Sequence, residues 1–237
     1  MRTACLAVFL VLGLFCRVDA ALVYEFSSPF ANDSEIKPSP TGEPPWLRAT
    51  FTNSDVVHQT VTLRLEAVNL PGEQFVTGFY FNFDPSLDVT QLDVVHQEGL
   101  EGKGVPGIGR DAFRADPDGY YDLFFEFSAS NGKGLHRFVG DSFAVYEISY
   151  LGVLDEQTNF AESFHCLSTP AGGFGPYHAV GRIQGLPDAE GEAEDSTWVF
   201  GTTPGDPGHS VPEPTNLLPW LVLGLLWLTF RRPSRAI

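Results

Sequence analysis

The sequence is poor in cysteine, in basic residues and in recognisable catalytic motifs. Its 237 residues include three cysteines, and 14 Lys and Arg stand against 30 Asp and Glu, for a net charge of −16. A surface this acidic repels nucleic acid, so we expect no nucleic-acid partner. No Gly-x-Ser-x-Gly, His-Glu-x-x-His, Cys-x-x-Cys or glycine-rich phosphate loop occurs, and no two histidines lie at metal-ligand spacing. We therefore expect a protein that is not an enzyme.

The scarce cysteines are concentrated at the N-terminus. Residues 1–20 combine a positive start, an apolar stretch and a small-residue cleavage site, as secretory signal peptides do. We predict export through the Sec translocon and cleavage by signal peptidase, which removes Cys5 and Cys16. The remaining Cys166 has no intrachain partner for a disulfide, so the fold must be stabilised by its core. We expect Cys166 to be a buried small side chain, with His165 on the opposite face of a strand.

The C-terminal segment has three parts in a fixed order. These are the motif Val211, Pro212, Glu213 and Pro214, an apolar run at 217–230, and a basic tail at 231–237 that contains Arg231, Arg232 and Arg235. As a helix, the 14-residue run reaches roughly 21 Å, which is short of the about 30 Å of a bilayer core. It predicts a transmembrane helix suited to a transient anchor. Arginines stay on the cytoplasmic side, so they set the topology and place the motif at the outer face.

This arrangement resembles the PEP-CTERM sorting signal of Gram-negative bacteria, which is named after the Pro-Glu-Pro triplet found here at 212–214. The resemblance implies that an exosortase recognises the motif and processes the chain at the inner membrane. It also implies a final location at the cell surface or in the extracellular matrix, in association with exopolysaccharide and biofilm. The function expected is therefore that of a non-enzymatic surface or matrix protein. The alternative is a secreted hydrolase that acts on the matrix polysaccharide.

Between the two signals the pattern is β. Residues 60–67 alternate strictly between apolar and polar, and residues 78–83 and 121–127 repeat that period with Phe79, Phe81 and Phe83 among the inward positions. Further strands are expected at 49–52, 92–96, 143–150, 179–184 and 197–200, and residues 101–109, with four glycines and a proline, are expected to form a mobile loop. No interior window keeps helical spacing. We predict one antiparallel β-sandwich at 21–200, with Greek-key or jelly-roll connections, and a flexible linker at 201–210.

A second resemblance is local. Residues 77–89 form a phrase in which an aromatic strand runs into Asp84-Pro85-Ser86, and this phrase is similar to one in cohesin-type sandwiches. It implies a cohesin-like sandwich and assigns no ligand.

Two groups of residues in the body are candidates for binding. Asp116, Asp118 and Asp122 surround a glycine turn and could supply oxygen ligands to calcium, although Asp-Gly before an alternating run is also an ordinary hairpin signal. Phe174 and Tyr177 lie among glycines that would let their rings face solvent and stack on sugars. Packing at the rim of the domain explains these two rings as well.

Overall fold

The computed structural model describes residues 21–30, 39–115, 119–132, 136–155, 157–187 and 195–204, and in them the protein is all-β. Its strands are β1 (Leu22–Pro29), β2 (Leu47–Asn53), β3 (Thr60–Ala67), β4 (Phe75–Phe81), β5 (Leu92–Gly99), β6 (Gly107–Ala115), β7 (Gly119–Glu126), β8 (Phe138–Val139), β9 (Phe143–Tyr150), β10 (Thr169–Pro170), β11 (Ala179–Leu186) and β12 (Asp195–Thr202). Two short 3-10 helices, η1 (Val89–Gln91) and η2 (Phe160–Phe164), lie between strands. None of the helices in these ranges is long and apolar enough to cross a membrane.

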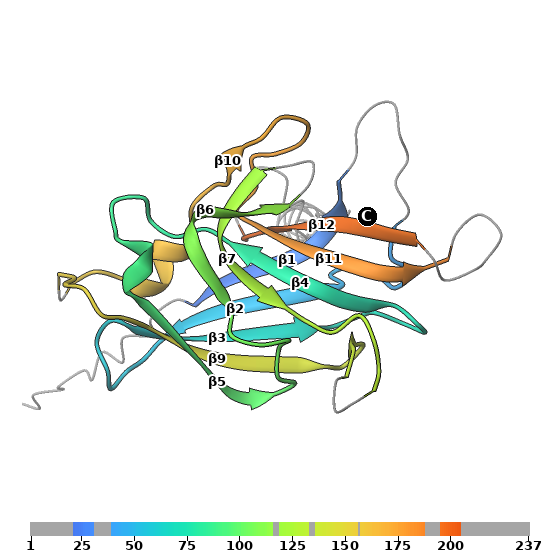
Figure 1. Cartoon of the computed structure of the whole chain (residues 1–237), viewed down its shortest axis with the longest axis horizontal. Coiled ribbons are helices and arrows are strands. Elements are labelled where there is room, and N and C mark those ends of the chain that lie inside the picture. Colours follow the sequence, from blue (N-terminus) through green and yellow to red (C-terminus); the bar gives the residue numbers. More distant parts are fainter. Residues whose placement is uncertain are drawn as a thin grey trace, which may run out of the picture.

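The strands form one antiparallel sheet. Its order is β10-β7-β4-β11-β12-β1-β2-β3-β9-β5, with β6 paired to β7 and β8 paired to β4. In Figure 1, β5 and β9 run along the lower edge, whereas β6, β10 and β12 lie near the top. Antiparallel pairing was predicted from the short strands and the missing crossover helices, and it is confirmed.

The sheet bends around a core of aromatic rings. Phe51 of β2 lies 5.2 Å from Phe81 of β4, and Phe125 of β7 lies 4.8 Å from Tyr146 of β9, measured between ring centroids. Both pairs join strands that are far apart in the hydrogen-bonded order. These contacts require that the two halves of the sheet face each other, so that alternate side chains of each strand fill the space between them.

The predicted inward positions are confirmed except for Tyr121, which is buried beside Tyr80 in a second cluster and not in the main core with Leu123, Phe125 and Phe127. Strand β3 has the exact bounds that alternation predicted, and Val61, Leu63 and Leu65 on its inward face are fully buried. Phe79, Phe81 and Phe83 are buried too. Trp46 is buried and donates a hydrogen bond of 2.6 Å from its indole nitrogen to the carbonyl oxygen of Gly42.

Three local expectations need correction or extension. The residues at 101–109 are not all loop, because β6 begins at Gly107 and pairs with β7. Strand β1 was not predicted, although it inserts between β12 and β2 at the centre of the order. His165 and Cys166 follow η2 rather than lying on a strand, so the expected separation onto opposite faces does not hold.

Candidate functional site

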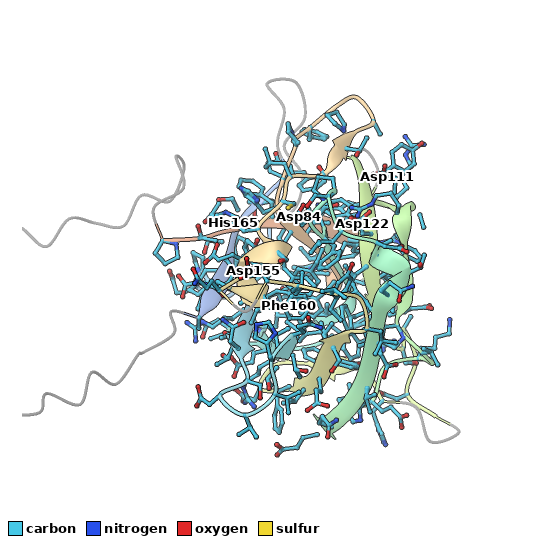
Figure 2. All side chains as sticks on the ribbon, turned by 90° about the vertical axis from the view of Figure 1, so that its left-hand side faces the viewer. Asp84, Asp111, Asp122, Asp155, Phe160 and His165 are labelled. Carbon is cyan, nitrogen blue, oxygen red and sulfur yellow. The ribbon has the colours of Figure 1, made fainter. Side chains whose placement is uncertain are left out.

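Two features outside the core collect chemically useful side chains. The first is a cleft of 460 Å³ near β10, which we call the Asp122 cleft. It is lined by Asn82, Phe83, Pro85, Arg110, Asp111, Asp122, His165, Cys166, Leu167, Thr169 and His178. Figure 2 shows Asp84 and Asp122 close together, with Asp111 on the side of β6 and β7 and His165 on the other side. The cleft therefore joins β6, β7, the end of β4 and the segment after η2.

Asp122 is the structural centre of this cleft. Its side chain is only 3% exposed and forms an ion pair of 2.6 Å with Arg110. The same carboxylate accepts a hydrogen bond of 3.0 Å from the main-chain nitrogen of Phe83 and one of 2.7 Å from that of Asp111. Both carboxylate oxygens are thus engaged, as a buried charge requires.

Arg110 extends this network to the loop after β4. Its guanidinium donates to the main-chain carbonyl oxygens of Phe83, Asp84 and Leu87 at 2.7, 3.0 and 2.8 Å. The planar fork of arginine can satisfy several acceptors at once. Arg110 and Asp122 therefore hold the Asp84-Pro85-Ser86 loop against β6 and β7.

The predicted calcium ligands are only partly within the described residues. Asp116 and Asp118 lie outside them, and Asp122 has the partners given above. In the described parts of the chain, no group of three or more His, Cys, Asp or Glu side chains has an arrangement that could hold a metal ion. Calcium binding at Asp116, Asp118 and Asp122 stays a prediction.

His165, Cys166 and His178 line the same wall of the cleft. The two imidazole rings lie 4.2 Å apart between centroids, and Tyr24 stacks on His178 at 6.3 Å. Burial raises the pKa of the half-buried Cys166 thiol, and the carboxylates of Asp84 and Asp122 raise it further. A raised pKa keeps the sulfur protonated, and the thiol is a far weaker nucleophile than the thiolate.

The second feature lies on the outer face of the sheet, and we call it the outer patch. It consists of the buried residues Phe30, Tyr80, Ala115, Tyr121 and Val180 and the partly buried residues Phe113, Phe124, Phe174, Tyr177, Trp198 and Phe200. In the register of the sheet, Tyr80 faces both Phe124 and Val180, and Val180 faces Phe200. Four neighbouring strands, β7, β4, β11 and β12, thus present one apolar row away from the core.

The rings of the outer patch form a continuous series. Phe124 stacks on Tyr80 at 4.5 Å, and Tyr80 lies 5.3 Å from Trp198. Trp198 stacks on Phe30 at 6.2 Å, and Phe30 lies 5.0 Å from Tyr177. The series crosses from β7 to the loop before β11, and each ring is held by its neighbours. The exposed edges therefore have fixed positions.

Phe174 and Tyr177, predicted from their glycine-rich surroundings, both belong to the outer patch. Tyr177 stacks on Phe200 with ring centroids 4.3 Å apart and an interplanar angle of 4°, and Phe174 lies 5.5 Å from Phe30. Both rings are half-buried, so they pack on the sheet and still keep part of their surface accessible. The sequence allowed two interpretations of these rings, packing at the rim of the domain and exposure to a ligand. The two are compatible at these positions.

Other members of both sites were not found from the sequence. Tyr80 and Phe124 occupy outward positions of strands whose inward positions are also aromatic. Alternation predicts polar residues at such outward positions, so the aromatic residues found there were the signal that could have identified this site. Arg110 directly follows the predicted loop at 101–109, in a stretch for which no element was predicted. No local pattern connects it to Asp122.

Comparison of the chain with protein-family models, with curated proteins and with solved structures gave no significant match. The predicted sorting motif Val211, Pro212, Glu213 and Pro214 and the tail arginines Arg231, Arg232 and Arg235 lie outside the described residues, as do the predicted signal peptide and transmembrane helix.

Proposed function

We propose that this protein is an exported, non-enzymatic component of the cell surface or extracellular matrix, and that its outer patch binds an extracellular polysaccharide. The observation that carries the proposal is the continuous series of rings on the sheet, in which the half-buried rings of Phe124, Trp198 and Tyr177 are joined by the buried rings of Tyr80 and Phe30. The flat faces of sugar rings present C–H groups, which pack on aromatic rings, while hydroxyl groups remain solvated. Rings that are already fixed lose little conformational freedom when a ligand binds.

The dimensions of the outer patch favour a polymer over a small ligand. Its rings extend from Phe113 on β6 through Phe124 and Tyr80 to Trp198 on β12, so they span several strands at about 4.8 Å per strand. A chain of sugars offers repeated stacking faces along such a row. This geometry supports a glycan that lies across the strands.

The buried carboxylate of the Asp122 cleft is engaged by other parts of the chain. A glycoside hydrolase needs two carboxyl groups free to exchange protons or attack the sugar. Asp122 is occupied by Arg110 and by two main-chain N–H groups, and the Cys166 thiol stays protonated. Asp122 therefore holds neighbouring loops in place, and it does not support the alternative of a hydrolase.

The route to the surface rests on the terminal segments. We propose that the signal peptide at 1–20 directs export, that the helix at 217–230 holds the chain briefly in the inner membrane, and that an exosortase acts at Pro212, Glu213 and Pro214. The arginines at 231, 232 and 235 orient the segment. We also infer that the bent sheet is a β-sandwich related to cohesin-type domains, because its two halves pack face to face and the phrase at 77–89 runs from β4 through a loop to η1.

Binding is tested with exopolysaccharide purified from the native host. Full-length protein is titrated with the polymer by isothermal calorimetry, and Trp198→Ala and Tyr177→Ala are compared with wild type. Phe143→Ala is the matched control, because Phe143 is also a half-buried ring but lies on β9 beneath Arg64. We expect both patch variants to lose at least tenfold in affinity and the control to bind normally. Equal affinity in all four proteins, or no binding by wild type, would refute the proposal.

Sorting is tested separately by intact mass. The protein is isolated from membrane and extracellular fractions of the host, with and without its exosortase. Loss of the residues after the motif only when the enzyme is present is the expected result. A mass that extends to Ile237 in both strains would show that the segment is not processed.

A further inference from the structure

A pocket at one end of the outer patch contains two arginines. It has a volume of 380 Å³ and is lined by Glu73, Phe75, Arg137, Arg182, Gln184, Gly185 and Ser196. This volume lies at the lower end of the range of about 300–1,000 Å³ found for ligand pockets. In the sheet register Arg182 faces Trp198, and Gln184 faces both Ser196 and Phe75. The pocket therefore continues the same outer face on which the rings lie.

Both guanidinium groups are positioned by aromatic rings. Arg182 lies over Trp198, 5.5 Å from the ring centroid, and Arg137 lies over Phe75 at 4.1 Å. A ring holds a guanidinium by its flat face and leaves the N–H groups at its edge available. Arg137 uses its Nε to donate to the carbonyl oxygen of Ala129. The stacking thus fixes the two cations without neutralising them.

Neither arginine has an acidic partner among the described residues. Arg48, Arg64 and Arg110 each form an ion pair with a carboxylate, whereas Arg137 and Arg182 form none with any residue that the structure describes. The Nε of Arg182 is buried and has no hydrogen-bond partner within the described chain. A buried donor left unsatisfied is costly, and native structures retain few of them.

The charge of the whole protein makes this pairing unusual. With 30 Asp and Glu for 14 Lys and Arg, carboxylates are abundant, yet among the described residues none is bonded to the two arginines that share this pocket. Glu73 also lines the pocket and is exposed, but it forms no ion pair with either arginine. An anion brought by a ligand would satisfy the donors that the described residues leave open.

Gly78 contributes to the same region by its lack of a side chain. It faces Arg182 on β11, and a Cβ atom at this position would lie 2.6 Å from the ring of Phe124. Gly78 is buried, and its missing side chain gives the Phe124 ring the room to stack on Tyr80.

We propose that this pocket binds the anionic group of an acidic sugar residue, a uronate carboxylate or a sulfate ester, while neighbouring sugars stack on the outer patch. This inference rests on the proposed polysaccharide binding and names the class of polymer, an acidic one. Arg137 and Arg182 bind the anion, and the side chains of Glu73 and Gln184 accept or donate hydrogen bonds to sugar hydroxyl groups. The net negative charge of the remaining surface limits non-specific binding of the same polymers.

The test uses full-length wild type, the double variant Arg137→Gln/Arg182→Gln, and Arg64→Gln as control. Arg64 is also stacked on a ring, Phe143, but lies outside the pocket on β3. Each protein is titrated with polygalacturonate, dextran sulfate and neutral dextran. We expect wild type to prefer an acidic polymer, with an affinity that falls as NaCl rises, and the double variant to lose about tenfold or more for that polymer alone. The polymer that wild type prefers identifies a carboxylate or a sulfate.

Failure of this proposal is separable from failure of polysaccharide binding. If wild type binds polymers but the double variant retains the same preference for acidic ones, the arginine pocket is refuted and the outer patch stands. If wild type binds no polymer, galacturonate and inorganic sulfate are tested for a rise in melting temperature. A rise lost only in the double variant would support the anion pocket without the polymer, and the absence of any rise would overturn it.

Discussion

The core and the outer patch are both built from aromatic rings, but they differ in what surrounds those rings. Phe81 in the core is fully buried and lies within 6.3 Å of Tyr24, Phe51 and Phe125. Trp198 in the outer patch is half-buried and carries Arg182 over its face. The same side-chain chemistry thus serves stability on one face and leaves accessible rings and cations on the other. The difference predicts that substitutions will separate stability from binding.

The largest effect is expected in the core. Phe81→Ala removes a fully buried ring from a cluster that cannot collapse easily, so it should lower the free energy of unfolding by about 3–5 kcal/mol. Guanidinium denaturation of wild type and variant measures this loss. A loss below about 1 kcal/mol would mean that the two halves of the sheet are not packed on each other at Phe81.

The next effect concerns the Asp122 network. Asp122→Ala leaves Arg110 and two main-chain N–H groups without their acceptor. Because the Arg110 side chain is 35% exposed and can be solvated, we expect a loss of roughly 2–3 kcal/mol, below that for a fully buried pair. Asp122→Asn keeps an acceptor and should lose less in the same denaturation experiment. Equal losses in the two variants would contradict a role for the hydrogen bonds.

An intermediate effect should appear at high pH. Burial raises the pKa of Tyr146 in the core and of Tyr80 in the outer patch to about 12, above the usual 10. The folded state then keeps protons that the unfolded state loses, so stability falls as pH rises from 10 to 12. Each tyrosine contributes roughly 2 kcal/mol to that fall. Tyr146→Phe should flatten the fall in urea titrations across this range, and an unchanged slope would show that Tyr146 ionises normally.

The smallest effect on stability is expected in the outer patch. Trp198→Ala removes a half-buried ring, so we expect a loss of only about 1 kcal/mol, far less than for Phe81→Ala. The same variant should lose polysaccharide affinity, whereas Phe81→Ala should bind normally at temperatures where it is folded. A Trp198→Ala protein as unstable as the core variant would make the outer patch a second core.

The predictable part of the fold follows from strict alternation. Residues 60–67 and 143–150 are strands with the expected bounds, because the side chains on one face of each strand are buried in the core. Strand β6 escaped prediction because its glycines and the register shift between Ile108 and Phe113 destroy the period.

The sites were less predictable because they are assembled by distant segments. Asp122 and His165 come from different parts of the chain, and only the bent sheet brings them to one cleft. Phe174 and Tyr177 were found because glycine marks exposed loops. Arg137 and Arg182 were not, since a single arginine on a strand has no local pattern that distinguishes a ligand site from a solvated surface.

The central claim is that a polysaccharide covers the outer patch, and hydroxyl-radical footprinting tests it most directly. Full-length protein is oxidised with and without the host exopolysaccharide, and modification of each aromatic residue is read by mass spectrometry. We predict that the polymer protects Trp198, Phe174 and Tyr177 and leaves Phe143 unchanged. Equal modification of Trp198, Phe174 and Tyr177 with and without a bound polymer would place the binding surface elsewhere and contradict the claim.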